Sequence, residues 1–165
     1  MRAFQILLGA VALGGTTYST CFSPEPANQI CYNTDGATAQ NIDLKDVKWI
    51  AGYLRHYENQ QKKQGKSPFH EMPVDKADNC AEWTVAERGN VMVLAKLVGE
   101  RDAAVTFSDI ASTIHSNEKS LVNCGTAGGQ MGVIVDKNSD LYKMKEFTER
   151  GFTTEGIVIK IVREP

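Results

Sequence analysis

The stretch FSDIASTIHSNEKSLVNCGTAGGQMGVIVD, residues 107–136, indicates how this chain folds. Apolar residues recur at helical spacing from Phe107 to Leu121, and Asn123-Cys124-Gly125 supplies a stop signal for that helix. A glycine-rich turn then leads into a strand over 130–135. The stretch therefore predicts a unit in which a helix runs into a strand, with a cysteine at the junction.

An earlier part of the chain repeats this order. Asp43 is a good N-cap and Gly65 a good stop for a helix over 43–64, and Cys80 precedes strands over 82–86 and 91–98. Residues 65–79 are rich in turn formers and predict a loop. The chain thus contains two related helix-then-strand units.

The remaining elements complete an α-β-β-α-β-(α)-β order. A short third helix is expected over 140–150 and a last strand over 156–163. This order predicts an α+β fold, a two-layer α/β sandwich whose four-stranded, mainly antiparallel sheet carries two long helices on one face. Strands 91–98 and 156–163 have the longest apolar runs, so they should form the central pair.

The N-terminus has the layout of a secretory signal peptide. A positive start at Met1-Arg2 precedes an apolar run over 6–13 and a small, polar stretch that ends at Ser19. We expect residues 1–19 to be a signal peptide, 20–42 an irregular arm tethered by disulfides, and 43–165 the sandwich domain. The predicted localisation is therefore extracellular, and no segment is apolar enough for a membrane span.

The composition argues against binding of nucleic acid. The 165 residues carry a net charge of −2, without a basic excess or a basic run of the kind that binds nucleic acid. No motif indicates a cofactor, and the expected protein acts as a monomer.

Four cysteines remain after the expected cleavage: Cys21, Cys31, Cys80 and Cys124. In an oxidising compartment an even number predicts two disulfides. Cys80 and Cys124 begin the two predicted edge strands, roughly 14 Å apart, whereas a disulfide needs Cα atoms within about 7 Å. We therefore favour Cys31–Cys80 with Cys21–Cys124, and the crossed pairing stays open.

The first predicted helix has an unusual outer face. Trp49, Tyr53, His56 and Gln60 form a stripe opposite the apolar face, where lysine and glutamate would be usual. Either the N-terminal arm packs across this stripe, or the stripe is exposed and is a candidate binding patch.

Motifs for catalysis and metal binding are weak. The Gly125–Gly129 segment follows a helix, whereas a phosphate-binding loop precedes one, so it is expected to be a turn. No cysteine or histidine spacing fits a metal site. Cysteine nucleophiles paired with His70 or His115 are less expected than disulfides. The neighbours His56 and Glu58, or His115 and Glu118, leave an acid/base pair of ribonuclease type open.

The overall pattern resembles that of small secreted effector-like proteins of ascomycetes. The residues behind this are the signal peptide, Cys31, the Ala77-Asp78-Asn79-Cys80 entry into a strand, and Asn123-Cys124 followed by Gly128-Gly129. They are similar to the killer-toxin-like fold of two αββ units and to the necrosis-inducing extracellular effector family. The resemblance implies a non-enzymatic secreted protein that acts by binding a host or a competitor.

Three functions are therefore compared. The first is the secreted effector-like or toxin-like binding protein. The second is a secreted small hydrolase or ribonuclease, which would need a pocket that joins a histidine to a carboxylate and an arginine. The third is a secreted protein that binds carbohydrate or a cell surface.

Overall fold

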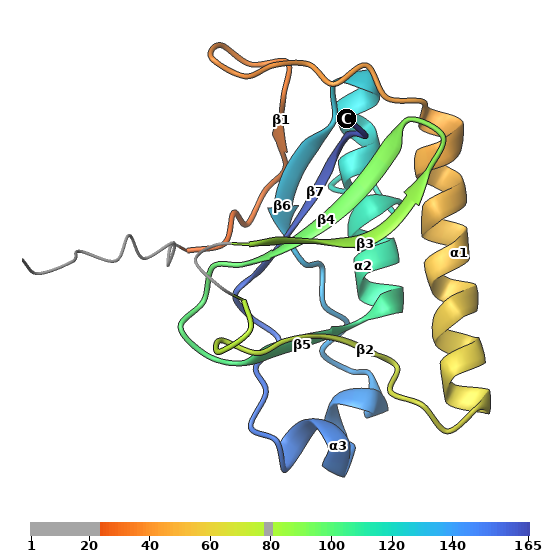
Figure 1. Cartoon of the computed structure of the whole chain (residues 1–165), viewed down its shortest axis with the longest axis vertical. Coiled ribbons are helices and arrows are strands. Elements are labelled where there is room, and N and C mark those ends of the chain that lie inside the picture. Colours follow the sequence, from red (N-terminus) through yellow and green to blue (C-terminus); the bar gives the residue numbers. More distant parts are fainter. Residues whose placement is uncertain (1–23, 78–80) are drawn as a thin grey trace, which may run out of the picture.

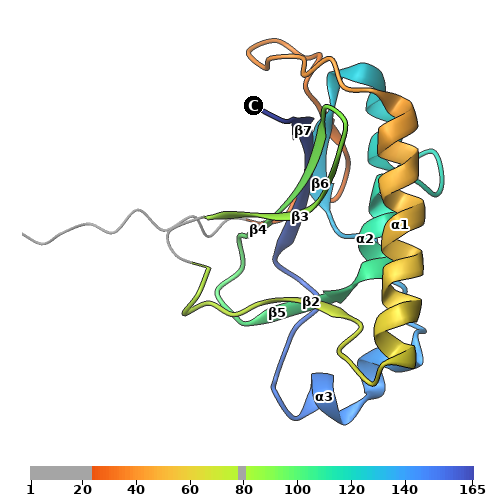
Figure 2. The same ribbon diagram turned by 45° about the vertical axis from the view of Figure 1, so that its right-hand side comes forward.

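The chain folds into a helical layer packed on one face of an antiparallel sheet. A computed structural model describes residues 24–77 and 81–165. Strands β1 (Ile30–Cys31), β3 (Glu82–Arg88), β4 (Val91–Leu97), β6 (Gly129–Gly132) and β7 (Ile157–Arg163) form a five-stranded sheet in the order β1-β6-β7-β4-β3. Helices α1 (Leu44–Lys63) and α2 (Phe107–Ile114) lie side by side on the same side of this sheet (Figures 1 and 2). The predicted α+β class and mainly antiparallel sheet are confirmed.

The centre of the sheet is the pair predicted from its apolar runs. Strand β4 pairs with β7 from Val91↔Arg163 to Leu97↔Ile157, and the side chains that face the helices are almost fully buried. Val93, Ala95, Ile159 and Ile161 lie in the main core against α1 and α2. Apart from Lys96 in β4 and Lys160 in β7, the residues that precede Arg163 in these two strands are apolar, as is typical of the centre of a sheet.

Helix α1 begins and ends where its local signals predict. Asp43 has extended backbone angles and accepts a hydrogen bond from the Lys45 amide, which satisfies an otherwise free N–H of the first turn. The apolar face buries Val47, Ile50, Ala51 and Leu54. Gly65 follows the helix with φ of 65°, a conformation that favours glycine.

A second, two-stranded sheet was not predicted. Strand β2 (Phe69–Met72) pairs antiparallel with β5 (Ala103–Thr106), although residues 65–79 were expected to be a loop and no strand was expected over 103–106. All four residues of β5 are buried, and Phe69 packs with Phe147 and Phe152 in a satellite cluster. Each strand is too short to show periodicity, and each acquires its structure from the other.

Helix α2 is shorter than predicted: it ends at Ile114 and does not continue to Asn123. His115 is extended, and the turn that follows is held by local bonds of Asn117, Ser120 and Asn123 side chains to nearby backbone groups. Residues Leu121–Ala127 are 3₁₀-helical except at Gly125, where the backbone is kinked. The third helix is likewise two short turns, Asp140–Lys143 and α3 (Lys145–Thr148).

The N-terminal arm adds a strand to the sheet. Strand β1 pairs with β6, so the main sheet has five strands where four were expected, and β6 is not an edge. Cys31 pairs in register with Gly129, where an added Cβ would lie 2.9 Å from the Cys124 sulfur. Only glycine leaves room for the cysteine side chain at this position.

The disulfide joins Cys31 to Cys124, with their Cα atoms 5.1 Å apart. The favoured pairing, Cys31–Cys80 with Cys21–Cys124, is therefore wrong, because the arm docks on β6 next to Cys124. The bond belongs to the crossed alternative, and Cys80–Cys124 is excluded as expected. Cys21, Cys80 and the predicted signal peptide lie outside the described residues.

Among residues 24–77 and 81–165, the helices are too short or too polar to cross a bilayer.

Candidate functional site

The predicted stripe on α1 lies at the surface. Trp49 is 45% exposed and Tyr53 39% exposed, and His56 and Gln60 are exposed as well. Residues 24–42 of the arm run along the sheet edge and past the top of α1, so they leave the stripe uncovered (Figure 1). Of the two interpretations of this face, the described residues fit the exposed one.

The aromatic rings of the stripe stack on one another along the helix. The rings of Trp49 and Tyr53 are 5.3 Å apart and almost parallel, and those of Tyr53 and Tyr57 are 5.9 Å apart. The Tyr57 ring then meets the edge of the Phe107 ring at the start of α2, 4.9 Å away. Aromatic residues four apart on a helix lie one above another, so this spacing builds the row directly.

Arg88 extends the row beyond Trp49. Its guanidinium lies 4.0 Å from the centre of the Trp49 ring, and its Nε donates to the Asp46 carboxylate at 3.0 Å. Asp46 is one turn before Trp49 and Tyr53 one turn after, so Arg88 and Tyr53 cover the two faces of the indole. The turn of the β3–β4 hairpin positions Arg88, and Asn90 holds that turn to the start of α1 by accepting from the Asp43 amide.

The stripe predicted from sequence included neither Arg88 nor Tyr57. Tyr57 is half-buried and joins the stripe to α2. No local pattern connects Arg88 to Trp49, since their contact depends on how the hairpin packs on the helix.

The stacking limits what this surface can bind. A sugar ring or a nucleobase needs an open aromatic face, whereas here neighbouring side chains occupy the faces. The stacking on their faces leaves mainly the ring edges of Trp49 and Tyr53 for a partner to contact. Such rigid, half-exposed aromatics beside an arginine are typical of the anchor residues in protein–protein interfaces.

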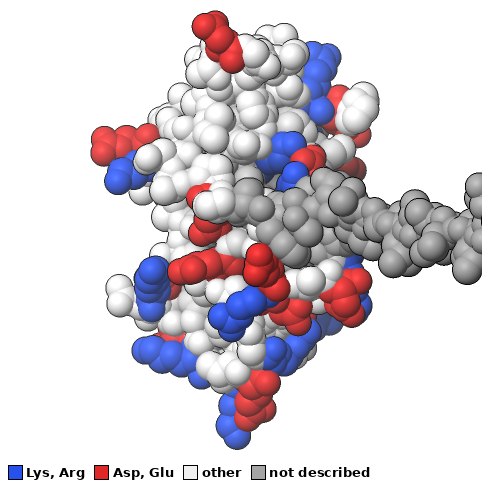
Figure 3. Space-filling view, turned by 90° about the vertical axis from the view of Figure 1, so that its left-hand side faces the viewer, with Lys and Arg blue, Asp and Glu red and all other residues white. Residues whose placement is uncertain are grey.

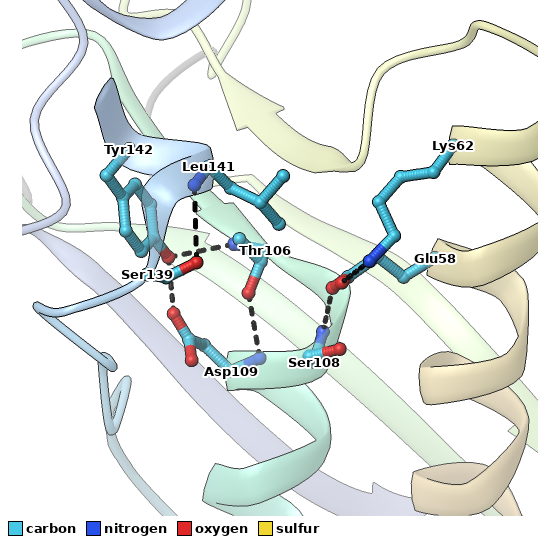
Figure 4. Close-up of polar contacts among 8 residues, drawn as sticks. All are labelled: Glu58, Lys62, Thr106, Ser108, Asp109, Ser139, Leu141 and Tyr142. Carbon is cyan, nitrogen blue, oxygen red and sulfur yellow. Dashed lines mark hydrogen bonds and ion pairs between the residues drawn. The ribbon is translucent and has the colours of Figure 1, made fainter. Parts of the chain in front are cut away.

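The structure separates the acid/base pairs considered from sequence. His56 faces solvent, whereas Glu58 is only 3% exposed and turns toward α2, where it accepts from the Ser108 amide at 2.7 Å and pairs with Lys62 at 3.1 Å (Figure 4). Within the described residues no hydrogen bond joins His115 to Glu118. Arg55 donates to the backbone carbonyl of His115, so this arginine ties the two helices together.

At the start of α2, Asp109 and Tyr142 belong to a network of hydrogen bonds. The Tyr142 hydroxyl donates to the Asp109 carboxylate and accepts from the Thr106 amide, and Thr106 Oγ1 accepts from the Asp109 amide (Figure 4). Burial raises the pKa of Asp109 and raises that of Tyr142 above its usual range. All these partners cap α2 or hold the 3₁₀ turn against it, so the network is structural.

His70 is a half-buried ionisable group whose Nε2 atom is enclosed by the protein. Its ring lies edge-on to Trp83 and Phe107, at 6.4 and 6.1 Å, and its Nε2 has no hydrogen-bond partner in the described structure. Burial lowers the pKa of His70 to about 4, so the ring is neutral at physiological pH. Its candidate cysteine partner, Cys80, lies outside the described residues. The other candidate nucleophile, Cys124, is in the disulfide.

The glycine-rich segment is a turn, as predicted. Gly125 and Gly128 have φ values of 61° and 72°, and a Cβ on Gly128 would lie 2.5 Å from the Ile161 carbonyl. The segment joins the 3₁₀ turn to β6 beside the central strand. It presents no helix N-terminus to an anion.

A hollow of about 480 Å³ lies where the arm meets the end of the sheet, lined by Glu25, Glu100, Arg101 and Glu155 among others. The Glu25 carboxylate accepts from the Gly156 amide at 2.9 Å, and burial, with the nearby Glu155, raises the pKa of Glu25. Glu25 therefore fastens the arm to the sheet. Neither this hollow nor the two other described ones is lined by a histidine. The described residues contain no cluster that could hold a metal ion.

Comparison with known proteins returns no match: no family model, curated protein or solved structure is similar to this chain. The candidate site therefore rests on geometry alone. It is the stacked row of Trp49, Tyr53 and Tyr57 on α1, together with Arg88 at the end of β3. We refer to it as the aromatic row.

Proposed function

We propose that this protein is secreted, has no enzymatic activity, and acts as an effector-like or toxin-like protein by binding a target of a host or competitor through helix α1. The observation that carries the proposal is the aromatic row, an exposed and internally stacked set of anchor residues. The signal-peptide pattern of residues 1–19 and the Cys31–Cys124 disulfide favour an oxidising, extracellular setting. The proposal places the chain with the ascomycete effector-like proteins that its sequence resembles.

The aromatic row favours binding because its side chains are already held in place before a partner arrives. A flexible tryptophan loses rotational freedom when a partner immobilises it, whereas Trp49 is already fixed between Arg88 and Tyr53. Large side chains with polar tips then offer contact area at a low entropic cost. A folded protein gains little stability by leaving two such rings about 40% exposed, so a role outside folding is the simpler explanation.

The other two functions have less support. A hydrolase would need a histidine near a carboxylate in a cleft, and the described histidines are exposed, half-buried at a loop, or enclosed by aromatic rings. Binding of a carbohydrate would need an open ring face, and the stacked row offers edges.

The test is binding of purified, fluorescently labelled protein to candidate target cells. Wild type should bind saturably, and the double variant Trp49→Ala/Tyr53→Ala should lose at least about tenfold in affinity, the usual effect of removing two anchor residues. The matched control is Val74→Ala/Met144→Ala, which truncates two similarly exposed apolar side chains, at 37% and 41%, away from the row.

Circular dichroism and secretion yield report whether each variant folds. Equal binding by wild type and a folded Trp49→Ala/Tyr53→Ala protein would contradict the proposal. So would equal losses in this variant and in the control.

A further inference from the structure

The outer face of α1 carries positive charge that is not neutralised locally. Lys45, Lys48 and Lys63 are exposed, and none has a carboxylate within 4 Å among the described residues. The two acidic residues of the helix are both engaged: Asp46 pairs with Arg88, and Glu58 is buried with Lys62. Between Leu44 and Lys63 a partner therefore meets cations but no free carboxylate, and the exposed N-cap Asp43 accepts from the Lys45 amide.

The positive charge on this face of α1 contrasts with the charge on the rest of the molecule. The net charge of the whole chain is −2, so the excess of carboxylates lies elsewhere. On the side opposite α1, lysines, arginines and carboxylates are interspersed (Figure 3), as in the Lys160–Glu82 pair at 2.6 Å. The positive electrostatic potential is therefore confined to the surroundings of α1, where it favours a negatively charged partner at short range.

Gly52 marks where such a partner would come closest. It lies in the exposed middle of α1, between the turns of Trp49 and His56, and a Cβ placed on it would meet no atom within 4 Å. Nothing in the fold requires glycine there, and glycine destabilises a helix interior by about 1 kcal/mol relative to alanine. The missing side chain leaves a notch beside the aromatic row, through which a backbone can approach.

From these three features we infer that the partner is an acidic polypeptide segment that lies along α1. Its backbone sits in the notch over Gly52, its apolar side chains contact the edges of Trp49 and Tyr53, and its carboxylates face Lys45, Lys48 and Lys63. These lysines span the helix, about 27 Å at 1.5 Å per residue, which is the reach of a short peptide. The inference rests on the proposed function and names the partner's chemistry.

Other occupants fit the same face less well. Single-stranded nucleic acid is held by stacking of bases on open aromatic faces, and a glycan is held in a similar way. The faces of Trp49 are covered by Arg88 and Tyr53. A two-fold interface uses the same surface of both subunits. A second copy of this chain would therefore bring its own lysines close to those of α1, where they repel one another.

The experiment is selection of a random dodecapeptide library on the folded, oxidised protein, with counter-selection against Trp49→Ala/Tyr53→Ala. The best peptide is then synthesised, and its Kd is measured by fluorescence anisotropy in about 50 mM and about 300 mM NaCl. Three folded proteins are compared with wild type: Lys45→Gln/Lys48→Gln/Lys63→Gln, Gly52→Ala, and the control Val74→Ala/Met144→Ala.

We expect enriched peptides to be net negative and to contain at least one aromatic or aliphatic anchor. The triple glutamine variant and the higher salt should each weaken binding by roughly tenfold, the triple variant should lose most of the salt dependence, and the control should bind like wild type. Gly52→Ala should weaken binding while the melting temperature rises, a combination that a purely structural glycine would not produce.

Enrichment of neutral or basic peptides, or of none, overturns the inference. So does binding that is indifferent to salt or to Gly52→Ala, self-association through α1 in sedimentation velocity, or tighter binding of single-stranded RNA or chitin oligomers than of any peptide. If cell binding still depends on Trp49 and Tyr53 in those cases, the proposed function stands and only the acidic partner is lost. If cell binding does not depend on them, the proposed function itself fails.

Discussion

His70 shows how one residue can couple this fold to pH. Its imidazole is held among the rings of Trp83 and Phe107 with an unpartnered Nε2, where a charge would be poorly solvated. The carboxyls of half-buried Glu25 and buried Asp109 have raised pKa values and act in the opposite sense, since their neutral forms are favoured in the folded protein. The pH dependence of stability is therefore a sum of opposing terms, and the histidine is separable by substitution.

At the residue scale we predict that His70→Phe flattens the acid side of the stability profile. The pKa of His70 is lowered from 6.5 to about 4 on folding, so below pH 6.5 the unfolded state binds the proton more readily. This costs wild type about 3 kcal/mol of folding free energy between pH 6.5 and 4, a loss that the variant escapes. Urea unfolding of both proteins across that range measures the difference.

A His70 resonance that titrates near pH 4 in NMR would support the same conclusion. Parallel stability curves for wild type and His70→Phe would contradict it.

At the scale of elements, α1 combines a robust scaffold with an exposed face that folding does not need. Its capping Asp43, its buried stripe and the Gly65 stop all serve the scaffold. The aromatic row and Gly52 lie on the other face. The two glycines of this region should therefore respond in opposite ways to the same substitution.

We predict that Gly52→Ala stabilises the protein by about 0.5–1 kcal/mol, because alanine is the better helix former and the space beside it is open. Gly65→Ala should instead destabilise by about 1 kcal/mol, since φ of 65° is strained for an L side chain. Thermal unfolding of both variants decides the matter. A destabilising Gly52→Ala would mean that the helix is bent or packed there in a way the structure does not show.

Across the whole molecule, the Cys31–Cys124 disulfide joins the arm to the second half of the chain. It closes a loop with a sequence separation of 93, and the Glu25–Gly156 hydrogen bond fastens the arm a second time. The arm thereby covers the edge of β6, which would otherwise be open to pairing with another chain.

We predict that Cys31→Ala/Cys124→Ala lowers the free energy of unfolding by about 4–5 kcal/mol, the loop-entropy value for this separation. Peptide mapping of the oxidised protein should recover Cys31 linked to Cys124. Under the hypothesis of two disulfides, the remaining pair is then Cys21–Cys80. Recovery of Cys31 linked to Cys80 would contradict both statements.

Features set by near neighbours in the chain were predictable from sequence. The bounds of α1 follow from a cap, a period and a stop, and the central strands β4 and β7 follow from the longest apolar runs in the chain's predicted strands. The stripe of Trp49, Tyr53, His56 and Gln60 was also visible, because four-residue spacing alone places side chains on one face. In each case the sequence signal lies within a few residues along the chain.

What required the tertiary structure is every feature that depends on distant partners. The β2–β5 sheet, the addition of β1 to β6, and the choice of Cys31–Cys124 all arise from how separate segments dock. So does the aromatic row as a rigid unit, because Arg88 reaches Trp49 only when the hairpin packs on α1. Short strands and lone side chains carry little information locally, and their free energy is set by neighbours that only the folded chain supplies.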